Sequence, residues 1–296
     1  MNIRRWEERG KHFQYNNHEI FYQDEDKREG EKEILVCIHG FPTSSWDWKC
    51  IWPQLTQKFR VIAADMIGFG FSDKPYNYMY SINDQATLHE KLLESLGVKV
   101  KSIHILAHDY GVSVAQELLA RYEDRKREGI VGIEIKSICF LNGGLFPETH
   151  HPRLVQKLLL SPIGYLVSYL MSEKRFNRSF GAIFGKDTKP SEKELKEFWE
   201  IVSNKKGLKI SHKIIGYMEE RKKYRRRWVG VLEKTKVVLR LINGGVDPVS
   251  GAHIAARYEE LIPNADIIVL PTIGHYPQIE DPARVWEALN VFWQKL

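Results

Sequence analysis

Short runs of consecutive apolar residues recur along this chain and alternate with segments of helical spacing. Four such runs occur in the first half, at residues 33–40, 60–65, 102–108 and 135–143. Two more follow a long intervening region, at residues 236–244 and 265–271. Apolar runs without polar alternation are typical of strands buried on both faces of a parallel sheet. The pattern therefore predicts a mostly parallel sheet that is covered by helices on both faces.

Residues 81–97 and 111–128 have apolar positions at helical spacing and lie between these runs. Residues 281–296 form another amphipathic segment, which begins with Asp281 and Pro282 as helices often do. Near the N-terminus, residues 12–25 form a predicted β-hairpin that turns at Asn16 and Asn17. With the hairpin included, the sequence predicts eight strands.

The region from 147 to 234 has a different texture, with helical pieces, Pro and Gly breaks, and many aromatic and basic residues. We expect one helix over residues 154–171 and another over 191–202. The order of strands and helices, then a helical insertion, then two further strands indicates a doubly wound α/β core with an inserted helical cap. We therefore predict a core of residues 1–146 and 235–296, and a cap of residues 147–234.

The formal net charge is +6, and part of the excess lies in the run "RKKYRRR" at residues 221–227. Charged runs on helices are usually solvated, and no known nucleic-acid-binding pattern accompanies this one. One alternative is that the run attracts an anionic substrate to the mouth of a site. Another is that Arg225, Arg226 and Arg227 stay solvated while Tyr224 and Trp228 pack inward. We expect no nucleic-acid partner.

Three cysteines, two of them within apolar runs, do not make a disulfide framework or a zinc site. The N-terminus lacks the apolar core of a signal peptide, and no run of about 18 apolar residues predicts a membrane span. We expect a soluble cytoplasmic protein without a membrane span. The sequence does not determine its oligomeric state.

Four motifs follow predicted strands, at the edge where open parallel sheets bind ligands. They are "HGFP" at residues 39–42, "AHDYG" at 107–111, "GGVDP" with Asp247, and "GHYP" with His275. Alone, each acidic residue has an ordinary explanation, Asp109 as a helix N-cap and Asp247 as a turn residue. A lone histidine is likewise more often structural. Together they give the order nucleophile, acid, histidine, each after a strand, so we predict an Asp109–His275–Asp247 triad.

These motifs, together with "DMIGFGFSDKP", resemble the α/β-hydrolase superfamily, and within it the epoxide hydrolases and haloalkane dehalogenases that use an aspartate nucleophile. A closer resemblance is to the mesoderm-specific transcript family. It rests on "LAHDYGVSVAQELLARY", "LNGGLFPETHHP", "RKKYRRRWVG" and "HYPQIEDP" and extends over nearly the whole chain. The resemblance implies the α/β-hydrolase fold, with an eight-stranded sheet and a helical cap.

An aspartate is ionised near neutral pH and can attack an sp³ carbon directly. The product is an alkyl ester of Asp109, which water activated by His275 then hydrolyses while Asp247 orients the imidazole. We expect the backbone N–H groups of Phe41 and Tyr110 to form the oxyanion hole. The triad and water suffice for this chemistry, so we expect no metal and no organic cofactor.

The leaving group determines the substrate class. The dehalogenase resemblance implies halide donors, usually a tryptophan after the nucleophile, but Tyr110 stands there and Phe41 follows "HG" instead of an asparagine. Trp46 or Trp48 can substitute, although packing in the core suits either tryptophan better. The epoxide-hydrolase resemblance implies two cap tyrosines that protonate the opening ring. The candidates are Tyr165, Tyr169, Tyr217 and Tyr224.

Some relatives place the triad acid after the strand that precedes the cap, where this chain has Asn142. Because asparagine carries no charge, Asp247 keeps the acid role, and Asn142 is a candidate hydrogen-bonding residue of the substrate site. We expect an epoxide hydrolase-like enzyme that acts on a small or medium apolar substrate. The alternatives are a haloalkane dehalogenase-like hydrolase, a non-catalytic interaction protein that retains the fold, and another reaction on the same scaffold, such as an oxygenase-type or lyase reaction.

Overall fold

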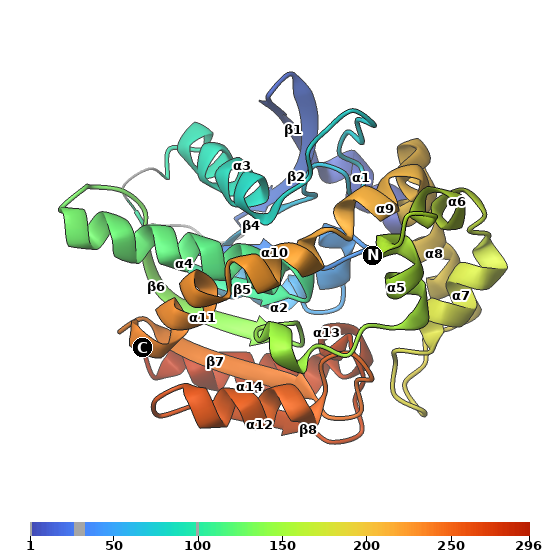
Figure 1. Cartoon of the computed structure of the whole chain (residues 1–296). Coiled ribbons are helices and arrows are strands. Elements are labelled where there is room, and N and C mark those ends of the chain that lie inside the picture. The colour runs from blue at the N-terminus through green and yellow to red at the C-terminus, as the bar shows by residue number, and fades with distance from the viewer. Residues whose placement is uncertain (1, 27–32, 99–100) are drawn as a thin grey trace.

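The computed structural model describes residues 2–26, 33–98 and 101–296. Within them, eight strands form one sheet in the order β1-β2-β4-β3-β5-β6-β7-β8 (Figure 1). The strands β1 and β2 pair antiparallel, as do β2 and β4, and all other pairs are parallel. The predicted mostly parallel, eight-stranded sheet is confirmed. The bounds are β1 Lys11–Tyr15, β2 His18–Glu25, β3 Ile34–Ile38, β4 Arg60–Ala64, β5 Ser102–His108, β6 Glu134–Leu141, β7 Val238–Gly244 and β8 Ile267–Leu270.

The N-terminal hairpin turns at Asn16 and Asn17, as predicted. Both residues have positive φ, 49° and 62°, and Tyr15 pairs with His18 across the two-residue loop. Two consecutive positive φ angles are typical of the tight turn whose twist matches that of antiparallel strands, and asparagine tolerates them.

The two faces of the sheet belong to two separate apolar cores. In β3, Ile34, Val36 and Ile38 belong to one core, while Leu35 and Cys37 belong to the other. Each strand contributes to both cores because successive strand side chains point to opposite sides of the sheet. Helices cover both faces. The first core includes α3 (Ile82–Ser95), α4 (Tyr110–Glu128) and α12 (Ala252–Leu261). The second includes α1 (Ile3–Arg9), α2 (Trp52–Lys58) and α14 (Pro282–Gln294), and the short α13 (Pro277–Glu280) precedes α14.

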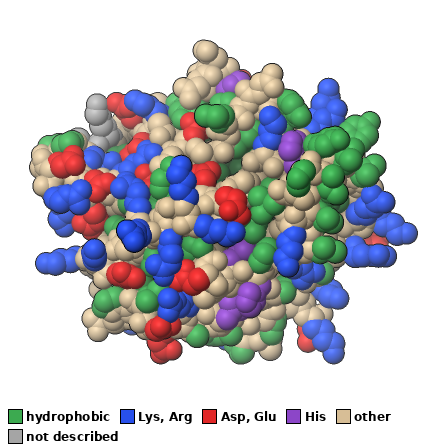
Figure 2. Space-filling view, in the orientation of Figure 1, with side chains coloured by type: hydrophobic (Ala, Val, Ile, Leu, Met, Phe, Trp, Pro, Cys, Tyr) green, Lys and Arg blue, Asp and Glu red, His purple; other side chains and the backbone are tan. Residues whose placement is uncertain are grey.

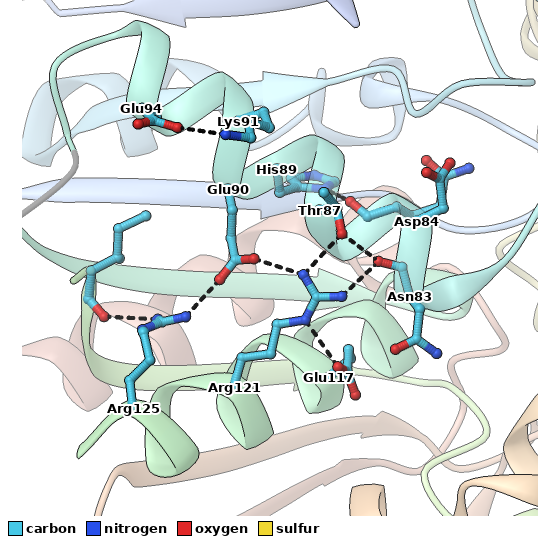
Figure 3. A network of polar contacts seen from close by, with 12 residues as sticks. Asn83, Asp84, Thr87, His89, Glu90, Lys91, Glu94, Glu117, Arg121 and Arg125 are labelled. Atoms are coloured by element: carbon cyan, nitrogen blue, oxygen red, sulfur yellow. Dashed lines mark hydrogen bonds and ion pairs between the residues drawn. The ribbon is translucent and has the colours of Figure 1, made fainter. Parts of the chain in front are cut away.

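A polar network fastens α3 to α4, the helix that begins at Tyr110 (Figure 3). The guanidinium of Arg121 donates to Glu90 at 2.6 Å, to the Asn83 carbonyl at 2.8 Å and to Thr87 at 3.0 Å. Arg125 donates to the same Glu90 carboxylate at 2.7 Å. The Glu90 carboxylate bridges two arginines, and this fixes the position of α4 more firmly than a single exposed ion pair would.

The helical insertion follows β6 and precedes β7, as predicted. Its helices are α5 Leu154–Leu160, α6 Gly164–Tyr169, α7 Glu173–Gly181, α8 Glu192–Ser203, α9 Ser211–Ile214, α10 Tyr217–Lys223 and α11 Arg225–Lys234. The single helix expected over 154–171 is instead two, α5 and α6. Ser161 has extended backbone angles because it precedes Pro162, and this ends α5. The division of the chain at residues 147 and 234 stays a prediction.

The basic run does not form a uniformly solvated face. Arg225 pairs with Glu148, and Arg227 pairs with Glu117 at 2.8 Å and also with Asp124. Trp228 is buried and donates its indole N–H to Glu117, which fastens α11 to α4. Among the described residues, no helix combines the length and the apolar character needed to cross a bilayer.

Candidate active site

Asp109 occupies a sharp turn between β5 and α4. Its backbone has φ 46° and ψ −104°, a conformation that non-glycine residues rarely adopt. The turn brings α4 so close to β3 that a Cβ at Gly111 would lie 2.3 Å from the Ile38 carbonyl oxygen. A Cβ at Gly40 would lie 2.8 Å from the Cβ of Asp109. The glycines at 40 and 111 are therefore required by the close packing around the turn.

The structure brings Asp109, Asp247 and His275 together at the carboxyl ends of β5, β7 and β8. The Nδ1 atom of His275 lies 2.7 Å from Oδ2 of Asp247, and its Nε2 atom lies 3.7 Å from Oδ1 of Asp109. All three side chains are buried. Because Nδ1 donates to Asp247, Nε2 is the nitrogen that faces Asp109 and any molecule bound beside it.

The triad holds strongly coupled charges. Burial alone would raise the pKa of Asp247, but the positive charge and hydrogen bond of His275 lower it to about 2. Burial likewise would lower the pKa of His275, but the charges of Asp247 and Asp109 raise it to about 9. The pKa of Asp109 also lies below its ordinary value despite burial, because His275 and Arg221 are positively charged. The resting site thus contains an imidazolium between two carboxylates.

Asn142 holds Asp247 and does not contact the pocket, which corrects its expected place in the substrate site. Its Nδ2 donates to Oδ2 of Asp247 at 2.7 Å, and its Oδ1 accepts the Gly244 N–H at 2.7 Å. The hydroxyl of Ser250 donates to the same carboxylate oxygen at 2.6 Å, and the Val249 N–H donates to the other at 2.8 Å. Asn142 is fully buried by these contacts, so it is a positioning residue for Asp247.

The Phe41 N–H donates to Oδ2 of Asp109 at 3.0 Å, where an oxyanion hole is expected. Tyr110 is the first residue of α4, and the first N–H groups of a helix have no partner within the helix. The role of its N–H as the second donor stays a prediction. His39 braces this loop, because its Nε2 accepts the Met66 N–H at 3.0 Å and its Nδ1 lies 2.8 Å from the Gly40 carbonyl.

A pocket opens over Asp109 and His275, with an empty volume of about 820 Å³ that is partly open to solvent. Its lining is predominantly apolar and comes largely from the cap, including Leu159, Met171, Phe176, Phe180, Ile183 and Val202. The lining found among the described residues contains no tryptophan and no asparagine. The pocket therefore places apolar side chains over the triad but lacks the usual pair of halide donors.

Two of the four candidate tyrosines lie on the outer surface of the cap. Tyr165 is 55% exposed and Tyr169 is 72% exposed, so neither protonates a substrate in this structure. Hydrophobic side chains gather over α5 and α6 in the space-filling view (Figure 2), and the exposed ones there include Leu154, Ile163 and Leu170. The side of the short helix α6 that carries Ser168 faces the pocket, and the opposite side faces solvent. The sequence spacing alone did not show which side the tyrosines occupy.

Tyr224 and Trp46 also lie away from the pocket. The half-buried Tyr224 ring packs against Trp228, with 5.2 Å between ring centroids. Trp46 is fully buried and packs edge-on against Trp6, at 5.5 Å, in the second apolar core. Both expected substrate roles are corrected, because each ring fills space between helices or under a loop.

Tyr217 is the candidate tyrosine that the structure places beside the nucleophile. Its ring packs against Tyr110 at 4.9 Å and Phe41 at 6.1 Å. Its buried hydroxyl makes no hydrogen bond among the described residues. Burial and the charge of Asp109 raise its pKa well above the ordinary value, so the hydroxyl keeps its proton at neutral pH. Such a hydroxyl is a suitable proton donor to an oxygen near Asp109.

Arg221 is a buried site residue that the sequence interpretation missed. Its Nε donates to Ser113 at 2.7 Å, and its Nη2 donates to the Asp109 carbonyl at 3.0 Å. The guanidinium lies 4.5 Å from the centre of the Tyr217 ring. Arg221 therefore fixes the strained turn and stabilises the charge of Asp109. The available signal in the sequence was that Arg221 follows Tyr217 by one helical turn, which puts both side chains on one side of α10.

Glu280 is a second missed residue and holds the loop that carries His275. One carboxylate oxygen accepts the N–H of Gly274 at 2.8 Å, and the other accepts the N–H of Tyr276 at 2.9 Å. The oxygen at Gly274 also accepts the N–H of Gly185 and the hydroxyl of Thr188, which belong to the cap. One half-buried carboxylate thus joins the histidine loop to the cap.

Comparison with known proteins agrees with this architecture. Residues 33–282 match the family described as the alpha/beta hydrolase fold. The mesoderm-specific transcript protein of Mus musculus is 45% identical over 285 residues, which cover 94% of this chain and 83% of the mouse protein. The cis-3-alkyl-4-alkyloxetan-2-one decarboxylase of Shewanella oneidensis is 27% identical over 259 residues, covering 84% of this chain and 78% of that enzyme.

Among solved structures, the haloalkane dehalogenase DatA of Agrobacterium tumefaciens has a TM-score of 0.76 at 20% identity, covering 97% of this chain and 96% of that one. The fold, the strand-end triad and the family match together define a member of the α/β-hydrolase fold family, with a pocket under its helical insertion. Within that family, the chain belongs with the mesoderm-specific transcript proteins.

Proposed function

We propose that this protein is a hydrolase that opens epoxides of small or medium apolar molecules through an alkyl ester of Asp109. The observation that carries the proposal is the state of that carboxylate. It is buried and ionised, it accepts the Phe41 N–H, and it lies beneath an apolar pocket. A buried carboxylate with a low pKa is a nucleophile ready for attack at carbon without prior loss of a proton.

In the first step, a carboxylate oxygen of Asp109 bonds to one epoxide carbon, and the bond from that carbon to the ring oxygen breaks. The oxygen that is released needs a proton, and the Tyr217 hydroxyl beside Asp109 is suited to donate it. Alkylation also removes the negative charge of Asp109. The pKa of His275 therefore falls, and its extra proton leaves to the tyrosinate or to water.

In the second step, neutral His275 takes a proton from water through Nε2, and the hydroxide attacks the Asp109 carboxyl carbon. The charge that develops on Oδ2 is stabilised by the Phe41 N–H, which already lies 3.0 Å from that atom. Breaking the ester bond releases a diol and regenerates the carboxylate. Asp247 stabilises the imidazolium that forms.

An epoxide is favoured over a haloalkane because of the lining of the pocket. Tyr110 is fully buried and is not among the described lining residues, and Phe41 lines the pocket but has no side-chain donor. The substitute Trp46 lies in the second core. Tyr217 is also outside the described lining, but its ring packs against Tyr110 and Phe41, which adjoin Asp109, so its hydroxyl is the nearest tyrosine acid of the four candidates. Halide departure needs hydrogen-bond donors, whereas epoxide opening needs an acid.

The test is to trap the ester. Replacing His275 with Gln removes the base but leaves Asp109 able to attack, so an epoxide substrate should leave an adduct that peptide mass spectrometry locates on Asp109. The panel contains alkyl epoxides, 1-haloalkanes and an alkyl-substituted oxetan-2-one, and His275→Gln/Asp109→Asn is the control. An adduct with haloalkanes alone contradicts the epoxide assignment. An adduct with the oxetanone alone points to a lyase, and no adduct or wild-type turnover with any compound points to a non-catalytic protein.

A further inference from the structure

Arg153 stands out among the residues that line the pocket. It shares the lining with Asp109 and His275, and it is half-buried. Its side chain makes no hydrogen bond and no ion pair to any residue within 2–26, 33–98 or 101–296. By contrast, Arg225 and Arg227 of the cap are paired with carboxylates at 2.5 Å and 2.8 Å. The five donors of the Arg153 guanidinium therefore remain available to a molecule in the pocket.

A bound substrate would change the surroundings of this cation. A molecule that fills the pocket displaces water from the side of Arg153 that faces it. Losing hydration without gaining a partner costs free energy, and the cost is larger for a charged group than for a polar one. A wholly apolar substrate would leave that cost uncompensated, whereas an anionic group on the substrate would offset it. The pocket thus favours a ligand with one negative charge.

The remaining lining restricts the shape of that ligand. Gln156 also belongs to the lining, and its Oε1 accepts the Arg153 backbone N–H at 2.8 Å, which places the two residues side by side where the chain enters α5. The apolar lining includes Val155 and Leu159 of α5 itself, and Phe176, Phe180 and Val202 of α7 and α8. The polar donors thus lie where the chain enters α5, next to an apolar surface formed by three helices, an arrangement that suits a molecule with a polar head and a hydrocarbon chain.

We infer that the substrate of this site is an anionic amphiphile whose carboxylate binds Arg153 and whose hydrocarbon chain packs against the apolar side chains of the cap. The inference rests on the proposed function for the reacting group, an epoxide carbon of the chain that reaches Asp109, and it replaces the wholly apolar substrate of that proposal with one that carries a charged head. The planar fork of a guanidinium matches both oxygens of a carboxylate, and this pairing is stronger than a hydrogen bond between neutral groups.

Binding without turnover tests the inference. The probes are decanoate, decyl phosphate and decanol, and their affinities for the wild-type protein are measured by titration calorimetry. Arg153→Gln should weaken decanoate by about tenfold and leave decanol within about twofold, since only the charged hydrogen bonds are lost. The matched control is Lys157→Gln, which removes an exposed cation from the same helix outside the pocket lining. It should leave both affinities unchanged.

Three outcomes would overturn the inference. They are equal decanoate affinity in the wild type and Arg153→Gln, an equal loss in Lys157→Gln, and decanol binding as tight as decanoate binding in the wild type. Tighter binding of decyl phosphate than of decanoate overturns the assignment of a carboxylate. Failure of this inference can be distinguished from failure of the proposed function. Neutral epoxides that alkylate Asp109 without any effect of Arg153 on binding refute only the inference, while Arg153-dependent binding without any epoxide adduct refutes only the proposed function.

Discussion

The protonation of His275 depends on the charge of the residue it faces. In the resting site its pKa is about 9, because burial is outweighed by the carboxylates of Asp247 and Asp109. A histidine that is protonated at neutral pH is not a base. Alkylation of Asp109 must therefore convert His275 from imidazolium to base, so ester formation prepares ester hydrolysis.

Replacing Asp109 with Asn imitates the loss of charge on alkylation. The pKa of His275 should fall from about 9 by at least about one unit, because one of the two carboxylates that stabilise the imidazolium is gone. NMR titration of the ring proton measures this, with His275→Gln used to assign the resonance. An unchanged pKa in Asp109→Asn would show that Asp247 alone sets the protonation state.

At the scale of single residues, the triad was predictable and Tyr217 was one of four candidate tyrosines, but the position of Tyr217 and the role of Arg221 were not predictable. Asp109, Asp247 and His275 each follow an apolar run, so the sequence order placed them at one edge of the sheet. Arg221 and Tyr217 reach that edge only because α10 of the cap lies across it, and their spacing does not reveal where the helix lies. Burial of a cation inside a basic run is a tertiary effect that composition conceals.

At the scale of elements, the histidine loop and the cap behave as one unit. Glu280 accepts hydrogen bonds from both neighbours of His275 and from Gly185 of the cap. The His275 N–H also donates to the Ile183 carbonyl of the cap at 2.9 Å. The base is thus held in place partly by the element that closes the pocket over it.

Glu280→Gln should weaken the attachment of the His275 loop to the cap, because the amide NH₂ would then face backbone N–H donors. We expect the free energy of unfolding to fall by about 1–3 kcal/mol. We also expect ester hydrolysis to slow more than ester formation, because His275 acts as a base only in the second step, so an Asp109 adduct should accumulate in the variant. Urea unfolding and intact mass measure the two effects, with Glu287→Gln on the exposed side of α14 as the control. Equal slowing of both steps would contradict a role specific to His275.

The cap was the part of the fold that the sequence predicted least well. Helical spacing over residues 154–171 continues through Ser161 and Pro162, so the break between α5 and α6 follows from proline sterics and not from the apolar pattern. The outward positions of Tyr165 and Tyr169 follow from that break. The strands of the core, by contrast, are continuous apolar runs between turn residues, and the structure places them within two residues of the predicted bounds.

At the scale of the whole molecule, the triad makes stability depend on pH. The folded-state pKa of His275 is raised from 6.5 to about 9, so its protonation contributes stability fully below pH 6.5 and loses that contribution as the pH rises through 9. The wild type should lose about 3 kcal/mol more than His275→Gln between pH 6.5 and pH 10. Urea unfolding across this range measures the difference, and parallel curves for the two proteins would contradict the charge arrangement.

The central claim is that water attacks the Asp109 carboxyl carbon and not the substrate. Wild-type protein that turns over an epoxide in H₂¹⁸O should incorporate ¹⁸O into Asp109, because each hydrolysis of the ester places one water oxygen in the carboxylate. Peptide mass spectrometry of the segment containing Asp109 measures this, with protein incubated without substrate as the control. We predict ¹⁸O in Asp109 after turnover. Diol that carries the label while Asp109 stays unlabelled would contradict the account.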